Sequence, residues 1–118
     1  MIPQLDALHA LVEHLEDHPG LADSVSAVRG LGQSSPWLDV QLSSAGNSLP
    51  AIAAWARTLD GSVSIHEVAG TGMHLRARGR FAGMRVEVVV VAPWSKRLSE
   101  LGPLAPADQI APEKARQR

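Results

Sequence analysis

The chain has 118 residues, no cysteine, and eleven basic against twelve acidic residues, which gives a formal net charge of -1. This length fits one compact domain, and the lack of cysteine excludes a disulfide framework, cysteine-ligated zinc and thiol catalysis. Because the charges nearly balance, binding to nucleic acid or to an acidic membrane would have to depend on a local patch.

The expected location is the cytoplasm. The first residues lead directly into a helical pattern, without the basic start and apolar run that are typical of a signal peptide. The longest apolar stretch, Val88 to Pro93, is far shorter than the roughly 20 residues that a membrane-spanning helix needs. We therefore expect no membrane partner.

The first half of the chain predicts one helix and two strands. Apolar residues recur at three- and four-residue steps through residues 4–18, which predicts an amphipathic helix that stops at Pro19-Gly20. Short apolar runs then predict strands at 25–29 and 37–42. In the second of these strands every other residue is apolar, which is typical of a sheet covered on one side. Trp37, Asp39 and Gln41 are expected on the uncovered side.

The second half predicts a helix and three strands. Residues 48–59 predict the helix, which Gly61 is placed to end in a left-handed conformation. Strands are expected at 62–68, 73–81 and 84–92. Prolines interrupt the rest, so residues 94–118 are expected to be a Pro-rich tail. It would hold at most a short helix and a mobile, basic end at Lys114 to Arg118.

The order of these elements, α-β-β-α-β-β-β, predicts the fold class. One-sided alternation in the strands favours a two-layer α+β domain over residues 1–93, with both helices on one face of the sheet. The sheet is expected to be mainly antiparallel and to have about five strands.

The last two strands form the clearest hairpin. A two-residue turn at Ala82-Gly83 sets a register in which aliphatic residues face the core. The opposite, outer side then carries Arg76, Arg78, Arg80, Arg85, Val89 and Val91. A three-residue loop at 69–71 in the preceding hairpin places His66 opposite His74 on the same outer side, and turns Glu67 inward.

The expected function is that of a non-enzymatic interaction module, most simply a homo-oligomer. Val89, Val91 and Trp37 would expose apolar surface beside arginines, which is typical of a protein interface. Self-association would use either the open sheet face or an edge strand. Edge pairing is favoured if the apolar strand around Val88 to Val91 lies at the edge of the sheet.

Three alternatives remain open. The arginines could contact the phosphates of a nucleic acid or another polyanion, with Trp37 as a stacking residue. The outer side could also be a solvated surface that binds nothing. Finally, a small-molecule-binding protein or enzyme could have a site between sheet and helices, with His66, His74 and Glu67 as acid, base or pH-sensing groups.

Sequence motifs give little support to catalysis or to a metal site. No serine lies in Gly-x-Ser-x-Gly, and the paired glycines lack the lysine and helix of a phosphate-binding loop. His14 and His18 lie one helical turn apart, but no third ligand accompanies them. We therefore expect neither a metal nor a cofactor, and favour a non-enzymatic role.

Overall fold

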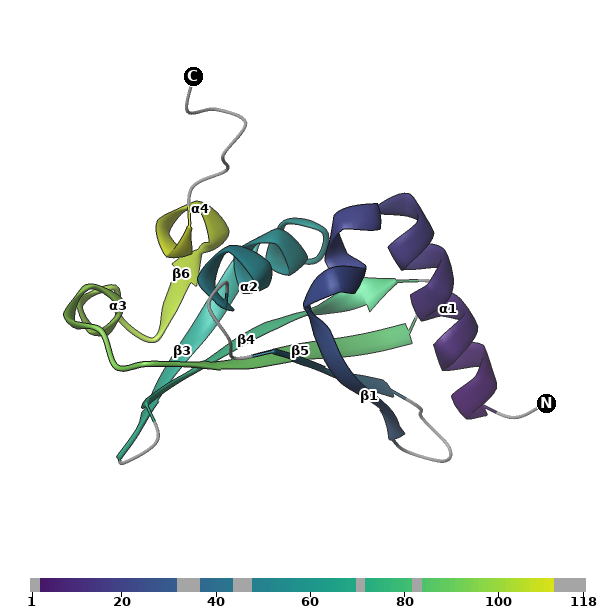
Figure 1. Ribbon diagram of the computed structural model, residues 1–118, viewed down its shortest axis with the longest axis horizontal. Helices are drawn as coiled ribbons and strands as arrows, with labels where there is room; N and C mark the ends of the chain where they lie inside the picture. Colours follow the sequence, from purple (N-terminus) through teal and green to yellow (C-terminus); the bar gives the residue numbers. More distant parts are fainter. Residues whose placement is uncertain (1–2, 32–36, 44–47, 70–71, 82–83, 112–118) are drawn as a thin grey trace, which may run out of the picture.

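The computed structural model describes residues 3–31, 37–43, 48–69, 72–81 and 84–111. The protein is α+β, with a mixed sheet of six strands in the order β1-β2-β5-β4-β3-β6. Helices α1, α2 and α4 lie on one side of this sheet, here called the inner face (Figure 1). The opposite side, the outer face, carries none of the described helices.

The helices and strands have the following bounds. The first half of the chain comprises α1 (Pro3–Asp17), the 3-10 helix η1 (Pro19–Ser24), β1 (Val25–Leu31), β2 (Trp37–Leu42) and α2 (Ser48–Arg57). The second half comprises β3 (Ser62–Val68), β4 (Gly72–Phe81), β5 (Met84–Ala92), α3 (Lys96–Glu100), β6 (Leu104–Pro106) and α4 (Ala107–Ile110). None of these helices is long and apolar enough to cross a membrane.

The predicted α+β class and the two helices on one face are confirmed, and the description of the sheet needs two corrections. A sixth strand, β6, pairs with β3, and β2 pairs with β5 in parallel, so the sheet is mixed. The remaining neighbours are antiparallel, as expected. Parallel pairing of strands distant in sequence leaves no turn signal, which is why the strand pattern alone missed it.

Both predicted hairpin registers are confirmed. Arg80 lies opposite Arg85, and Arg78 lies opposite Glu87 across β4 and β5. In the preceding hairpin His66 lies opposite His74, and the inner positions of β3 meet those of β4. The turn at Ala82-Gly83, the loop positions Gly70-Thr71 and the basic end lie outside the described residues.

The apolar strand β5 is not at an edge of the sheet. It lies between β2 and β4, so its backbone is paired on both sides and the condition under which edge pairing through this strand was favoured is not met. Its inner side chains are buried, as the rule for a covered strand requires. The two edges belong to β1 and to the three-residue strand β6.

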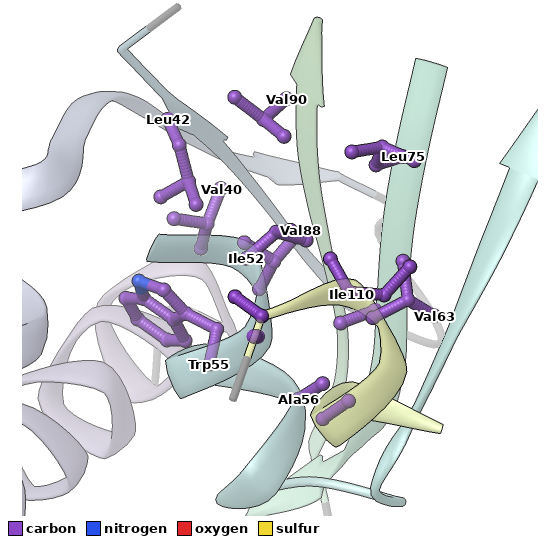
Figure 2. Packing of buried hydrophobic residues seen from close by; sticks show 14 of the residues in the cluster. Val40, Leu42, Ile52, Trp55, Ala56, Val63, Leu75, Val88, Val90 and Ile110 are labelled. Carbon is purple, nitrogen blue, oxygen red and sulfur yellow. The ribbon is translucent and has the colours of Figure 1, made fainter. Parts of the chain in front are cut away.

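The core lies between the inner face and α2. This helix crosses β5, β4 and β3, and Figure 2 shows its Ile52 and Trp55 beside Val88 and Val40. Leu59, just after α2, can lie close to β4 because residue 79 is a glycine, where an added Cβ would lie 2.8 Å from the Leu59 Cβ. Gly61 follows with a φ of 85°, the left-handed conformation expected at the helix end.

Helix α1 packs against this core through a histidine. The His14 ring stacks on Trp55 with centroids 5.8 Å apart, and its Nε2 lies 2.9 Å from the Thr58 Oγ1. Burial and the neighbouring His18 lower the pKa of His14, although Asp17 acts in the opposite direction. The Trp55 indole in turn donates to the Ser24 hydroxyl. In the described part of the chain, no buried side-chain polar atom lacks a hydrogen-bond partner.

The C-terminal segment belongs to the core through residue 111, further than the sequence predicted. Leu98 of α3 and Ile110 of α4 are buried with the sheet residues, and Figure 2 shows Ile110 beside Val63. The Arg97 guanidinium joins the two helices by donating to the carbonyls of Gln109 and Ile110. The prolines did not prevent this fold, because β6 is an edge strand and tolerates them.

Candidate functional site

The candidate site is the outer face, where alternation in four strands gathers charged side chains. Buried neighbours turn the intervening residues of β2, β4 and β5 outward, and β1 continues the surface through Arg29, which lies opposite Asp39. The cationic residues of this face are Arg29, Arg76, Arg78, Arg80 and Arg85. Among the described residues, the carboxylates of this face are those of Asp39 and Glu87.

Glu87 binds two of the arginines. Its Oε1 accepts from the Arg76 Nη1 and its Oε2 accepts from the Arg78 Nε, each at 3.0 Å. The Glu87 side chain is only 19% exposed, so it is held under the two guanidinium groups that it joins. Arg78 is the partner opposite Glu87, whereas Arg76 reaches it diagonally.

A third ion pair lies on the β1 side of the face. The Arg29 Nη2 donates to the Asp39 Oδ2 at 3.1 Å, and Asp39 keeps only 10% of its side chain exposed. Sequence reasoning placed Asp39 outward but did not pair it. Its alternation with Leu38 and Val40 was the available signal, while the partner could be found only from the register of β1.

Arg80 and Arg85 form the remaining part of the cationic face. They lie directly opposite each other in β4 and β5, where Cβ atoms are about 5 Å apart, and neither has an ion pair within the described ranges. Like charges in this position destabilise a sheet. The Arg85 guanidinium lies 5.9 Å from the ring centroid of Trp37, its parallel neighbour in β2.

A hollow of about 260 Å³ lies beside these residues. It is lined by Trp37, Arg78, Gly79, Arg85, Val86 and Glu87. Gly79 and Val86 face the core, so the strand backbone forms the floor and the four other side chains form the rim. This hollow is on the outer face of the sheet.

The outer face exposes less apolar surface than the sequence suggested. Val89, Val91 and Trp37 are on this face as predicted, but all three are half-buried. The large apolar side chains that stand exposed lie elsewhere, and include Leu8 at 39% and Val12 at 52% on α1. Val89 lies between Arg76 of β4 and Gln41 of β2, and Val91 lies opposite His74, so longer polar side chains flank both valines.

The candidate acid and base groups do not form one cluster. His66 and His74 lie opposite each other on the outer face, but Glu67 points to the other side of β3, as predicted. There its carboxylate accepts hydrogen bonds from the Trp94 indole at 2.6 Å and from the Ser99 hydroxyl at 3.0 Å. Glu67 therefore anchors the C-terminal segment rather than completing a site with the histidines.

Among the described residues, no group of three His, Cys, Asp or Glu side chains is placed to hold a metal ion. Comparisons of the chain with protein-family models, with curated proteins and with solved structures find no significant match. The chemistry of the outer face is therefore the basis for a functional proposal.

Proposed function

We propose that this protein is a non-enzymatic binding module that holds a nucleic acid against the outer face of its sheet. The observation that carries the proposal is the uneven distribution of charge over the protein surface. Although the formal charge of the chain is -1, the part that the structure describes places five guanidinium groups and two carboxylates on one open face. Phosphate contacts of this kind supply most of the affinity in binding that does not depend on sequence.

The spacing of the arginines supports the same proposal. Arg76, Arg78 and Arg80 alternate along β4, so their Cα atoms follow one another at about 6.7 Å. A line of guanidinium groups suits the repeated phosphates of an extended strand, because each planar group can donate two parallel hydrogen bonds. The cytoplasmic location expected for a chain without cysteine is part of this proposal.

Self-association through the outer face, the first expectation from sequence, has weaker support. Two copies placed face to face would bring like net charges together, which costs affinity unless each carboxylate meets a guanidinium of the partner. The valines that motivated this expectation are half-buried in the monomer. Little apolar area is therefore left to compensate for the repulsion.

A different surface favours self-association as a second candidate function. Leu8 and Val12 lie one turn apart on α1, both exposed, and α1 packs beside the edge strand β1. A second copy could pair with β1 and cover this apolar strip in one interface. Sedimentation at micromolar concentration should then show a dimer that Val12→Asp dissociates and Glu13→Gln leaves intact. A monomer at that concentration would contradict this candidate.

The principal proposal is tested by binding a labelled single-stranded 12-mer and its duplex in a series of chloride concentrations, read by fluorescence anisotropy. Binding should weaken as salt rises. Arg78→Gln should reduce the slope of log affinity against log salt by about one, as removal of one phosphate contact does. Lys96→Gln removes the same charge from α3 and serves as the control. Absence of salt-dependent binding to both oligonucleotides would refute the proposal.

A further inference from the structure

We propose that Arg80, Arg85 and Trp37 form a site for a dianionic phosphate. Such a group is a phosphomonoester, and not the phosphodiester that links nucleotides within a strand. The ligand would be the terminal phosphate of a nucleic acid or the phosphate of a free nucleotide. The first of these sources rests on the proposed function, whereas the second does not.

The pattern of ion pairs on the outer face supports this site. Arg29 is bound by Asp39, and Arg76 and Arg78 share Glu87. Arg80 and Arg85 are the members of the face that have no carboxylate partner within the described residues. Two of the three net positive charges of these residues therefore lie where β4 ends and β5 begins, and the third lies on the group that Arg76 and Arg78 form with Glu87.

Two opposed guanidinium groups fit a doubly charged anion. Because Arg80 and Arg85 lie directly across the hairpin, their side chains start close together and repel each other. A phosphate between them turns this repulsion into two charge-assisted contacts. A phosphomonoester carries about -1.5 to -2 charges at neutral pH, so a single group can match both arginines, whereas a diester carries one charge.

Trp37 positions one of these arginines. Its ring lies 5.9 Å from the Arg85 guanidinium, which limits the orientations that this long side chain can adopt. Less side-chain freedom is then lost when an anion binds. Trp37 thus acts through Arg85, and its removal should weaken binding less than removal of the arginine itself.

The adjoining hollow sets the orientation of the ligand. Arg85 and Trp37 lie on its rim together with Glu87, whose carboxylate would repel a second anionic group. The phosphate is therefore expected at the Arg80 and Arg85 side, with an uncharged part of the ligand directed toward Glu87. A ribose hydroxyl can donate to that carboxylate, and this contact would suit a nucleotide better than inorganic phosphate.

The decisive experiment compares 3′-labelled single strands that differ only in a 5′-phosphate, in chloride buffer. We expect the phosphorylated strand to bind about tenfold more tightly, the difference that one additional charge-assisted contact gives. Arg80→Gln and Arg85→Gln should each remove this difference. Lys96→Gln should preserve it, and Trp37→Leu should reduce it only in part.

A second arm uses adenosine 5′-monophosphate against adenosine, measured by calorimetry with the same variants. Binding of the nucleotide alone, lost in Arg80→Gln, supports the site even if no oligonucleotide binds, and in that case the proposed function fails. Salt-dependent binding of both strands without any preference for the 5′-phosphate, together with no nucleotide binding, overturns the site and leaves the proposed function standing. The variants should keep the thermal unfolding of the original protein, because Arg80 and Arg85 are exposed. This result excludes misfolding as the cause of lost binding.

Discussion

The two faces of the β4–β5 hairpin follow the same alternation but differ in how completely their side chains are satisfied. On the inner face Leu75, Val88 and Val90 are buried under the helices, and each apolar surface meets another. On the outer face two ion-pair groups are complete, but Arg80 and Arg85 oppose each other. Local conflicts of this kind concentrate at functional sites, so the unsatisfied end of the outer face is where binding is best sought.

The two tryptophans on opposite sides of the sheet provide the sharpest contrast. Trp55→Ala removes a fully buried side chain, its stacking on His14 and its bond to Ser24, and should lower the free energy of unfolding by about 3–5 kcal/mol. Trp37→Ala should cost about 1 kcal/mol or less, because this ring is half-buried on the outer face. Urea denaturation followed by circular dichroism measures both. Equal losses of unfolding free energy would show that Trp37 on the outer face stabilises the fold as much as the buried Trp55 does.

Val88 and Val89 are neighbours that point to opposite faces of the sheet, so the same substitution at each position compares the two faces without a difference in side-chain size. Val88→Thr buries a hydroxyl in a fully covered position and should destabilise the protein by about 1–3 kcal/mol. At the next residue, Val89→Thr places the same group on the outer face and should change stability by less than about 0.5 kcal/mol. Thermal unfolding of the two variants compares them directly. A similar cost at both positions would argue that the outer face is covered.

Charge reversal at the opposed arginines should separate stability from binding. Arg80→Glu replaces a like-charge pair with an opposite-charge pair, and is expected to raise the free energy of unfolding by roughly 0.2–1 kcal/mol. The same change should abolish the preference for a 5′-phosphate. A variant that loses stability as well would indicate that the two arginines already share a counter-ion in the free protein.

A pH titration examines the inner face by itself. The folded-state pKa of His14 lies below the unfolded value of 6.5, so the unfolded chain binds the proton more readily. The stability that His14 contributes is therefore present above pH 6.5 and is lost as the pH falls toward the lower, folded-state pKa. His14→Gln keeps a partner for Thr58 and should flatten this part of the stability curve. Identical pH dependence in the two proteins would contradict the buried position of His14.

The outer arginines could be predicted because their positions follow from local sequence. Alternation with period two and the short connections fix which side chains of β3, β4 and β5 lie together, and both registers agree with the structure. The sharing of Glu87 by Arg76 and Arg78 was not predictable in the same way. It depends on a diagonal reach between long side chains, which the pairing of opposite residues does not reveal.

The parts that sequence missed are those that depend on distant contacts. The position of β5 at the centre of the sheet requires β2 to approach it from the other half of the chain. Strand β6 is a three-residue strand with proline at its end, too short to show alternation. Its pairing with β3 becomes evident only when Leu98 and Ile110 are seen to fill the core beside it.

The parallel contact between β2 and β5 also bears on how the chain reaches its native state. The hairpins close locally, but this ladder joins Trp37 to Arg85 and Val40 to Val88, with α2, β3 and β4 all lying in between along the chain. Contacts of such high sequence separation lower folding rates, because the intervening chain must be ordered before they form. Docking of the N-terminal hairpin onto β5 is therefore the expected late step, and the hollow beside Trp37 is completed only when it occurs.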